Sequence, residues 1–597
     1  MTFFVHANKD ATVVICPDRL SYLRFLWNDF LIEISSADAP SERTTPERSP
    51  SVNGQAVDSA SGGRETPVVI VGGGPVGLTL ALDLAWQGIP CTLIEQSDGS
   101  VTNAKFVDIN MRTMEFCRRW GIAEEIRDKG FNKDYPQDLV FVTSLTGHLL
   151  GRLRLPSFAE LRAPPTAAER IARCPQTIFD PIVRRVAESM PGVTLRYGAR
   201  CDGVTQDTNG VTALVTNMAT RQQERIRAAY LACCQGAASS LRDELGVGFN
   251  GEGTLSYSTN ITFRSESLLR LHDKGPGFYT AIGPEGRWAS MLALDGRDTW
   301  RLHSVEKVDG SAAIRRFVGC DFDYEIVTAL TWQRRELVAD QYQVGRVFFL
   351  GDAAHQLSPS GGFGLNTGIG DVTNLSWKLA AVLTGWGSPK LLASYDIERR
   401  PVGKRTARTA THLFRTLQQD PPPGPAILAD GPEGDAVREV VRARVAAMLA
   451  RSNCGYDYGA RYEDAGLQLG YFYEGSPVIV PDGTPAPIDD PRNYSPIARP
   501  GSRAPHFWLD ENRSVLDLFG HGFTLLRLGR TPPSADRFEA AAARLGVPLR
   551  THSLPHEHLL ALYNQRLALV RPDGHIAWRG DEAPKNCDAV LNTVRGA

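Results

Sequence analysis

The chain has 597 residues, which at about 100 to 200 residues per domain predicts a multidomain protein and excludes a single small module. Hydrophobic residues make up 42% and charged residues 22%, a globular mixture, and no run approaches the roughly 18 apolar residues of a membrane span. With 65 basic and 67 acidic residues the formal net charge is -2, which argues against nucleic acid as a partner.

The N-terminal residues 1–65 are expected to form a disordered leader. Residues 35–65 are rich in Ser, Pro, Thr, Gly and charged residues, which bury too little apolar area to offset the entropy of ordering. An apolar stretch at 23–34 is interrupted by Asp29 and Glu33, and it lacks the flanks of a signal peptide. The ten cysteines include no CxxC pair and no zinc-type cluster, so we expect reduced thiols, a cytoplasmic location and no metal.

A βαβ unit is predicted from residue 67 onward. The β-branched run Val68–Val71 is typical of a buried strand, apolar residues at helical spacing occupy 78–86, and a second strand is expected over 91–95. The intervening sequence Gly72-Gly73-Gly74-Pro75-Val76-Gly77 satisfies GxGxxG. Its glycines allow a tight turn, close approach of the backbone to a pyrophosphate and close helix packing.

An acidic residue stands where a nucleotide site needs one. Glu95 ends the second predicted strand about 20 residues beyond the glycines, where a carboxylate can accept the hydroxyls of a ribose. Strand, glycine loop, helix and acid together predict a dinucleotide site. This βαβ unit does not separate FAD from NAD.

A second glycine-rich passage favours FAD. Gly351-Asp352 follows a predicted strand at 347–350, and a loop from Pro359 to Gly368 leads into a helix expected from about Leu365. FAD is long enough to contact the chain at two separate passages. It needs a second acid for its ribityl chain and a bare backbone at its ring, whereas NAD needs only the βαβ unit. The helix start would also direct N–H groups at the negative charge of reduced flavin.

These motifs resemble those of the FAD-dependent aromatic hydroxylases of the para-hydroxybenzoate and phenol hydroxylase type, and are most similar to hydroxylases that tailor aromatic polyketides and indolocarbazoles. The resemblance runs from Val68 to the C-terminus and includes Asn103-Ala104-Lys105, Arg112-Thr113-Met114-Glu115 and Cys174-Pro175-Gln176-Thr177. It implies that Pro359, Gly364 and Asn366 lie at the catalytic flavin ring. It also implies that FAD is bound by Gly72, Gly74, Pro75, Val76, Gly77, Glu95, Gln96, Lys105, Arg112, Gln176, Gln235, Gly351, Asp352, Gly362, Gly364, Leu365 and Asn366.

The same resemblance implies an α/β architecture in several parts. A Rossmann-like FAD-binding domain of the glutathione reductase type is expected over 66–415, with a mixed β-sheet substrate domain inserted at about 137–170 and 247–345. A helical or linker region over 416–495 and a thioredoxin-like domain over 496–597 follow. Only Cys587 lies beyond residue 500, so we expect the last domain to be redox-silent.

The activity implied is NAD(P)H- and O2-dependent hydroxylation of a small phenolic or polycyclic aromatic substrate through a C4a-hydroperoxyflavin, in secondary metabolism. Baeyer-Villiger oxygenation, a nicotinamide-only dehydrogenase and a non-enzymatic flavin-fold ligand carrier stay as alternatives, and a homodimer is left open. The substrate itself is not predicted, because pocket residues in this fold come from variable strands and loops.

One position departs from the family pattern. Where the family has Asp-Gly after a strand, this chain has Gln235-Gly236, which keeps a hydrogen-bonding side chain but loses a formal charge. We expect slow flavin reduction by nicotinamide, unless the glutamine makes the same hydrogen bonds. His355 and Asp371 are expected to be structural.

Residues 298–305 alternate with period 2, which predicts a half-buried strand. In this part of the chain, four side chains are candidates for substrate contact, although each alone is more typical of core or surface. They are Tyr257, Tyr279, Trp288 and His303.

Overall fold

The structure is a computed structural model, and it describes residues 4–6, 12–14, 64–101, 104–451 and 464–597. Two units are distinguished, Met1–Gly62 and Gly63–Ala597. In the first unit, strand β1 (Phe4–His6) pairs antiparallel with β2 (Thr12–Val14).

The predicted leader falls almost wholly on residues that the structure does not describe. The apolar stretch at 23–34 lies outside the described residues, and so does most of the Ser- and Pro-rich sequence after it. Strand β3 begins at Arg64, two residues before the predicted start of the FAD-binding domain.

The first large sheet of the second unit carries the glycine-rich loop. Its strands are β3 (Arg64–Val71), β4 (Cys91–Ile94), β9 (Val193–Arg196), β10 (Ala199–Gln206), β11 (Val211–Asn217), β12 (Gln223–Cys233), β18 (Gln343–Val344) and β19 (Val347–Phe349). β9, β4, β3, β12 and β19 run parallel, and β10 and β11 extend the sheet antiparallel. Val68–Val71 is buried on both faces, as expected of a central parallel strand.

Helices pack around this sheet and around each other. They are α2 (Pro75–Trp86), α3 (Met111–Arg119), α4 (Ala123–Lys129), α5 (Gln176–Ser189), α6 (Ser240–Glu244) and α8 (Phe363–Leu383). α2 packs against both α5 and α8. A short ladder of β5 (Asp108–Ile109) and β8 (Ala172–Arg173) lies near α4. The predicted strand-loop-helix passages at 68–86 and 347–365 are therefore present.

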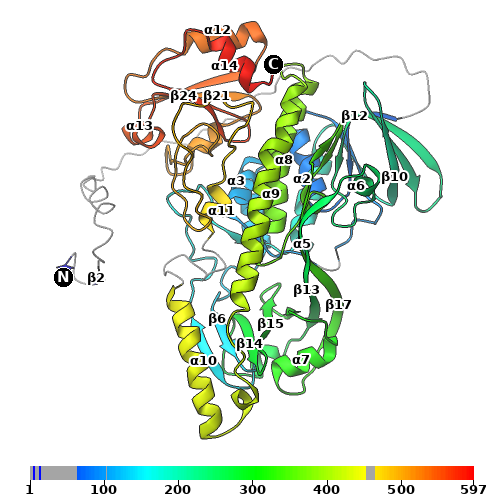
Figure 1. Ribbon diagram of the computed structural model, residues 1–597, viewed down its shortest axis with the longest axis vertical. Coiled ribbons are helices and arrows are strands. Elements are labelled where there is room, and N and C mark those ends of the chain that lie inside the picture. Colours follow the sequence, from blue (N-terminus) through cyan, green and yellow to red (C-terminus); the bar gives the residue numbers. More distant parts are fainter. Residues whose placement is uncertain (1–3, 7–11, 15–63, 102–103, 452–463) are drawn as a thin grey trace, which may run out of the picture. The chain divides into compact units, whose positions relative to one another are not determined.

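A second eight-stranded sheet stands apart from the first (Figure 1). Its strands are β6 (Leu139–Val142), β7 (Leu149–Leu153), β13 (Phe249–Arg264), β14 (Phe278–Gly283), β15 (Gly286–Ala293), β16 (Thr299–Ser304), β17 (Glu325–Ala339) and β20 (His355–Gln356). Helix α7 (Gly310–Val318) packs its apolar face into the sheet's core with Trp288 and Trp300. β20 pairs with β17 just after the Gly351-Asp352 turn, so the two sheets meet beside that turn.

Two long helices follow α8 and the glycine-rich loop at its start, from Pro359, which we call the flavin-type loop. α9 (Lys390–Leu417) runs the length between the two sheets, and α10 (Pro432–Arg451) lies against β7 and the second sheet (Figure 1). α9 ends at Leu417, before the proline run at 421–425, and that run leads into a short 3-10 turn at Pro425–Leu428. Among the described ranges, no helix is both long and apolar enough to cross a lipid bilayer.

The C-terminal elements form a separate four-stranded sheet with helices on it, coloured orange and red in Figure 1. They are β21 (Phe523–Leu528), α12 (Asp536–Leu545), β22 (Leu549–Leu554), α13 (Glu557–Tyr563), β23 (Leu567–Val570), β24 (Ile576–Gly580) and α14 (Cys587–Val594). The strand order is β22-β21-β23-β24, with β21 and β22 parallel and the other pairs antiparallel. Helix α11 (Ala465–Leu469) precedes this sheet and contacts α3.

Candidate active site

One cavity of about 780 Å³ joins the two large sheets, and most of the predicted site residues line it. Its first end lies at the loops after β3 and β4, and its far end lies among β13, β16, β17, α9 and α10. The predicted residues on its wall are Gly72, Gly74, Pro75, Val76, Glu95, Gln96, Lys105, Gln176, Gln235, Asp352, Pro359, Gly362, Gly364 and Leu365.

The glycine loop brings bare backbone to the cavity. α2 begins at Pro75, with no side chain capping its first N–H groups. A side chain at Gly72 would overlap the carbonyl of Cys234, and one at Gly77 would overlap the carbonyl of Gly72, whereas Gly74 has no atom within 4 Å of a Cβ. The loop therefore combines close packing at its ends with an open approach at Gly74, which suits a pyrophosphate.

Glu95 is held at the cavity by backbone donors. Its Oε2 accepts from the N–H of Gly73 at 2.6 Å, and its Oε1 accepts from the N–H of Ser97 at 2.8 Å. The carboxylate is thus tied to the glycine loop itself, where it can meet a ribose bound beside that loop.

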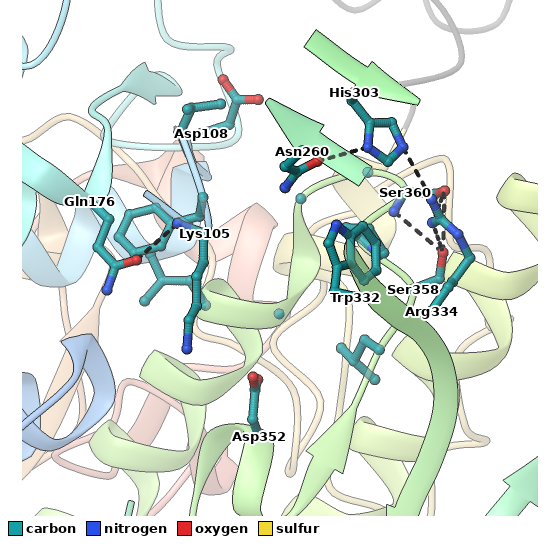
Figure 2. Close-up of a pocket in the computed structure, with 18 of the residues that line it drawn as sticks. Lys105, Asp108, Gln176, Asn260, His303, Trp332, Arg334, Asp352, Ser358 and Ser360 are labelled. Carbon is teal, nitrogen blue, oxygen red and sulfur yellow. Dashed lines mark hydrogen bonds between the residues drawn. The ribbon is translucent and has the colours of Figure 1, made fainter. Parts of the chain in front are cut away.

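Lys105 and Gln176 are linked by a hydrogen bond, shown in Figure 2. The N–H of Lys105 donates to Oε1 of Gln176 at 3.0 Å, and Nε2 of Gln176 donates to Oδ2 of Asp180 at 2.9 Å. Asp180 is 1% exposed, and this burial raises its pKa to about 7. Gln176 thus connects the backbone of Lys105 to a buried carboxyl whose pKa lies near 7.

Replacing Asp180 by Asn is expected to stabilise the protein at pH 8 and to change little at pH 4. Because the folded pKa lies above the ordinary value near 4, this group's contribution to stability is full below about pH 4 and is lost as the pH rises from there to about 7. The gain should be about 1 to 3 kcal/mol at pH 8. Urea unfolding at both pH values measures it, with the exposed Asp128→Asn as control. An equal effect at the two pH values would contradict the assignment.

A second open helix start faces the same cavity. α8 begins at Phe363 after Gly361 and Gly362, both at positive φ (+88° and +72°), with no side-chain cap. Gly364 has no atom within 4 Å of a Cβ. This backbone can approach a flat ring closely and can direct N–H groups toward negative charge on it.

The turn that carries Asp352 is held from behind by Asp371. Asp371 accepts from Gly351 N–H at 3.2 Å, from Nε2 of His355 at 2.7 Å and from Nε of Arg399 at 2.8 Å. Burial opposes its ionisation, but His355 and Arg399 hold the pKa of Asp371 below its usual value. His355 and Asp371 are fully buried and lie off the cavity wall, in agreement with a structural role.

Four predicted site residues do not line the large cavity, namely Gly77, Arg112, Gly351 and Asn366. Gly77 and Gly351 lie in the turns behind it. Asn366 binds the loop to its neighbour instead: its Nδ2 donates to Gly362 carbonyl oxygen at 2.8 Å, and its Oδ1 accepts from the N–H of Asn110. Its amide thus fixes the loop at the start of α8.

Arg112 points away from the nucleotide end. Its Nη1 donates to Glu115 at 3.0 Å, and its Nη2 donates to the carbonyl of Asp573 at 2.7 Å, in the turn between β23 and β24. The sequence analysis predicted that Arg112 binds FAD, because it lies in the same stretch of family resemblance as Lys105. The structure gives it partners that tie α3 to the C-terminal part of the chain.

Gln235 lines the cavity and also caps α6. Its Oε1 accepts from the N–H of Leu241 at 3.1 Å and from the hydroxyl of Ser239 at 3.0 Å. A carboxylate at this position would accept from the same donors, so the glutamine reproduces the hydrogen bonds while removing the charge.

The far end of the cavity differs from the sequence expectation. β16 alternates as predicted, and its second face lines the cavity: Arg301 and His303 lie on the cavity wall, while Trp300 and Leu302 enter the core of the sheet. Of the four substrate-contact candidates only His303 reaches the cavity wall. Tyr279 and Trp288 lie in the core, and Tyr257 is on the surface, 41% exposed.

Sequence reasoning missed most of this wall. Asn260, Trp332 and Arg334 come from β13 and β17, and Phe414 comes from the end of α9. The alternation of Trp332 and Arg334 was a usable signal that they share a face of one strand. Nothing in the sequence told which face would meet a cavity.

The comparisons with known proteins agree with this geometry. Residues 65–410 match the family described as FAD binding domain, and residues 498–597 match that described as aromatic-ring hydroxylase, C-terminal. The chain is 30% identical over 575 residues to tetracenomycin B2 monooxygenase-dioxygenase of Streptomyces olivaceus, which covers 89% of this chain and 98% of that one. It is 31% identical over 577 residues to phenol 2-monooxygenase of Pseudomonas sp. (strain EST1001), covering 89% and 92%.

Solved structures give the same result. The rebeccamycin biosynthetic enzyme RebC with reduced flavin matches with a TM-score of 0.82 at 38% identity, covering 90% of this chain and 100% of that one. Aklavinone-11 hydroxylase with FAD and aklavinone matches with a TM-score of 0.74 at 27% identity, covering 90% and 100%. Fold and cavity thus define an FAD-binding oxidoreductase.

The chain belongs to the FAD-dependent aromatic hydroxylases, a family of flavoprotein monooxygenases. The family and the mixed α/β fold predicted from the sequence are confirmed, and FAD is the cofactor of this fold.

Proposed function

We propose that this chain hydroxylates a planar, polycyclic phenolic substrate with O2 and with electrons from NAD(P)H. The observation that carries the proposal is one cavity that runs from two open helix starts to an apolar and aromatic chamber with polar groups on one wall. Two proteins similar to this chain are named putative polyketide hydroxylase, and aklavinone-11 hydroxylase was solved with FAD and aklavinone.

The residues at the first end fit FAD. The start of α2 and Lys105 would hold the pyrophosphate, Glu95 the adenosine ribose and Asp352 the ribityl chain. The loop from Gly362 to Leu365 would lie against the ring. When bound and reduced, FAD supplies the activation of molecular oxygen.

The chain's own contribution is to position the aromatic substrate and to exclude water. Trp332 and Phe414, with Leu292, Leu413 and Met448, give the chamber its apolar walls. Pro359 has no N–H to donate, and its carbonyl accepts from the N–H of Gly362 at 3.0 Å. A dry chamber favours oxygen transfer over wasteful release of peroxide.

His303 does not serve as a base in this arrangement. Arginine is only a donor, so Nε2 of His303 accepts from Arg334 at 3.3 Å and its Nδ1–H donates to Oδ1 of Asn260 at 2.9 Å. Burial, with Arg334 and Arg301 nearby, lowers the pKa of His303 to about 3. The imidazole is therefore neutral at physiological pH and fixed in one tautomer.

The finer architecture belongs to the same proposal. Residues 66–415 would form the FAD-binding domain, with the substrate domain inserted at about 137–170 and 247–345, and residues 496–597 a thioredoxin-like domain. The C-terminal strand order supports the last assignment. Cys587 is buried, its thiol donates to the carbonyl of Pro584, and burial raises its pKa, which supports a domain without a redox role.

The test begins with the cofactor. The purified protein should release FAD in near one-to-one ratio, and Asp352→Ala should weaken FAD binding by about 1 to 3 kcal/mol, because ribityl hydroxyls lose their acceptor. Fluorescence titration of the apoprotein measures the change, and the exposed Asp128→Ala on α4 should leave affinity unaltered. Unchanged affinity in Asp352→Ala would remove this residue from the site.

Turnover tests the reaction. A panel of hydroxylated polycyclic aromatics should stimulate NAD(P)H oxidation and yield a product with one added oxygen. Stimulated oxidation that gives only hydrogen peroxide for every member of the panel would count against the proposed hydroxylation.

A further inference from the structure

Arg334 lies on the wall at the far end of the cavity, which we call the substrate wall. It is a buried cation, and all its hydrogen bonds go to neutral groups. Its side chain is 2% exposed. Its Nη1 donates to Ser358 at 2.7 Å and to Ser360 at 3.3 Å, and its Nη2 donates to Ser258 at 3.4 Å and to His303. Its Nε–H has no hydrogen-bond partner within the described part of the chain.

Three other deeply buried arginines of this protein are paired with acids, whereas Arg301, which lines the same cavity and is 6% exposed, donates to the carbonyl of Ala104. Arg399 pairs with Asp371, Arg503 with Glu115 and Arg571 with Glu398, each in direct contact. No ion pair of Arg334 occurs among the described residues, and burial alone lowers its pKa to about 10, so it stays charged at neutral pH. A buried charge without a counter-ion is costly. Its place on the cavity wall indicates that the missing anion comes with the ligand.

The guanidinium is held in a fixed place. Its carbon lies 4.2 Å from the ring centre of Phe414 and 5.3 Å from that of Trp332. The ring of His303, which accepts from Arg334, stacks on Trp332 with centroids 5.9 Å apart. Figure 2 shows Arg334 reaching toward His303 and the two loop serines together. A charge preorganised in this way loses little entropy when it binds an anion.

Ser360 adds a polarised donor beside the charge. Its Oγ accepts from Arg334 and from the hydroxyl of Ser358 at 3.3 Å. Both bonds use its oxygen, so its own hydrogen is left to donate to a ligand, and the neighbouring cation strengthens that donation. Ser360 lies on the cavity wall between Pro359 and Gly361, in the loop that precedes α8.

We propose that Arg334, with Ser360 beside it, binds an anionic oxygen of the aromatic substrate, either a ring carboxylate or an ionised ring hydroxyl. The inference rests on the proposed function, because it concerns the substrate of the same cavity. A neutral analogue leaves the buried guanidinium without its counter-ion, so the wall selects anionic aromatics over neutral ones of the same shape.

The test is anaerobic equilibrium binding to the FAD-bound protein. The probes are anthraquinone-2-carboxylate, its neutral methyl ester, and 2-hydroxyanthraquinone at a pH where its hydroxyl is ionised. The wild type should bind each anion about 10- to 100-fold more tightly than the ester. Arg334→Gln should abolish this preference while leaving ester binding unchanged, and Arg334→Lys should retain part of it, since the charge stays but the planar fork is lost.

Arg335→Gln is the matched control. Arg335 is the next residue of β17, bonds to Gln333 and Gln356, and does not line the cavity. It should leave the preference for anions intact. Comparison of the two anionic probes tells which source of negative charge the wall prefers, because the preferred one loses more affinity in Arg334→Gln.

Two results would overturn the inference. One is a wild-type protein that prefers neither anion over the ester, and the other is an Arg334→Gln variant that loses the ester and the anions equally, which would mark a purely structural arginine. These measurements need no turnover. A preference for anions without any hydroxylated product would leave the inference standing and would count against the proposed function alone.

Discussion

Replacing Glu398 by Gln is expected to lower the free energy of unfolding by about 3 to 5 kcal/mol, because it leaves the buried Lys378 without its carboxylate and leaves Arg571 paired with Asp573 alone. Arg571 binds both oxygens of Glu398, at 2.6 and 2.8 Å, and Nζ of Lys378 donates to it at 2.7 Å. All three side chains are fully buried. Although burial opposes ionisation, Arg571 and Lys378 hold the pKa of Glu398 far below its usual value.

The effect should be global, since this cluster joins distant segments. Asn374 and Lys378 come from α8, Glu398 from α9, Ser476 from the segment after α11, and Arg571 from the C-terminal sheet. We therefore expect α8, which begins at the flavin-type loop, to loosen together with the C-terminal domain. Urea unfolding followed by far-UV circular dichroism measures the loss.

Two further variants make that measurement specific. Glu439→Gln on α10 removes an exposed carboxylate that pairs with Arg442, and it should change stability by less than about 1 kcal/mol. Adding Lys378→Met to Glu398→Gln should recover part of the loss, because it removes the buried cation that has lost its carboxylate. A single variant that unfolds at the wild-type urea concentration would show that the cluster contributes nothing.

The sequence predicted the site features that depend on local interactions, and it missed those that depend on residues far apart in the chain. The loop from Gly72 to Gly77, Glu95 and the Gly351-Asp352 turn each follow a buried strand within a few residues, so their positions depend on local geometry. The structure brings them to one cavity, as parallel strands that end at the same edge of a sheet require.

The substrate wall and the buried charge cluster around Glu398 depend on how segments far apart in the sequence align with each other. Arg334 meets His303 because β17 and β16 both pair with β13, and it meets Ser358 because β20, which Ser358 follows, pairs with β17. Glu398 meets Arg571 from another domain. No periodicity within one segment encodes such pairs, since a shift of one residue in any strand would turn Arg334 to the opposite face.

Gly77→Ala is expected to weaken FAD binding more than 10-fold and to destabilise the apoprotein by about 1 to 3 kcal/mol. Gly77 lies in the first turn of α2, where a methyl group would overlap the carbonyl oxygen of Gly72 and touch the side chain of Cys234. Backbone cannot yield as a flexible side chain does, so the glycine loop must move away from the start of α2 at the cavity. Denaturation of the apoprotein and fluorescence titration with FAD measure the two effects.

Gly74→Ala distinguishes an effect on the packing of the apoprotein from an effect on the approach of FAD to the backbone. Gly74 has φ -72° and no atom within 4 Å of a Cβ, so alanine should fold there without strain. Its methyl group would project into the cavity beside the start of α2. We therefore expect unchanged apoprotein stability and weaker FAD binding. Wild-type FAD affinity in Gly74→Ala would mean that the backbone at this position does not lie against the cofactor, and wild-type affinity in Gly77→Ala would mean that the tight turn is not what binds it.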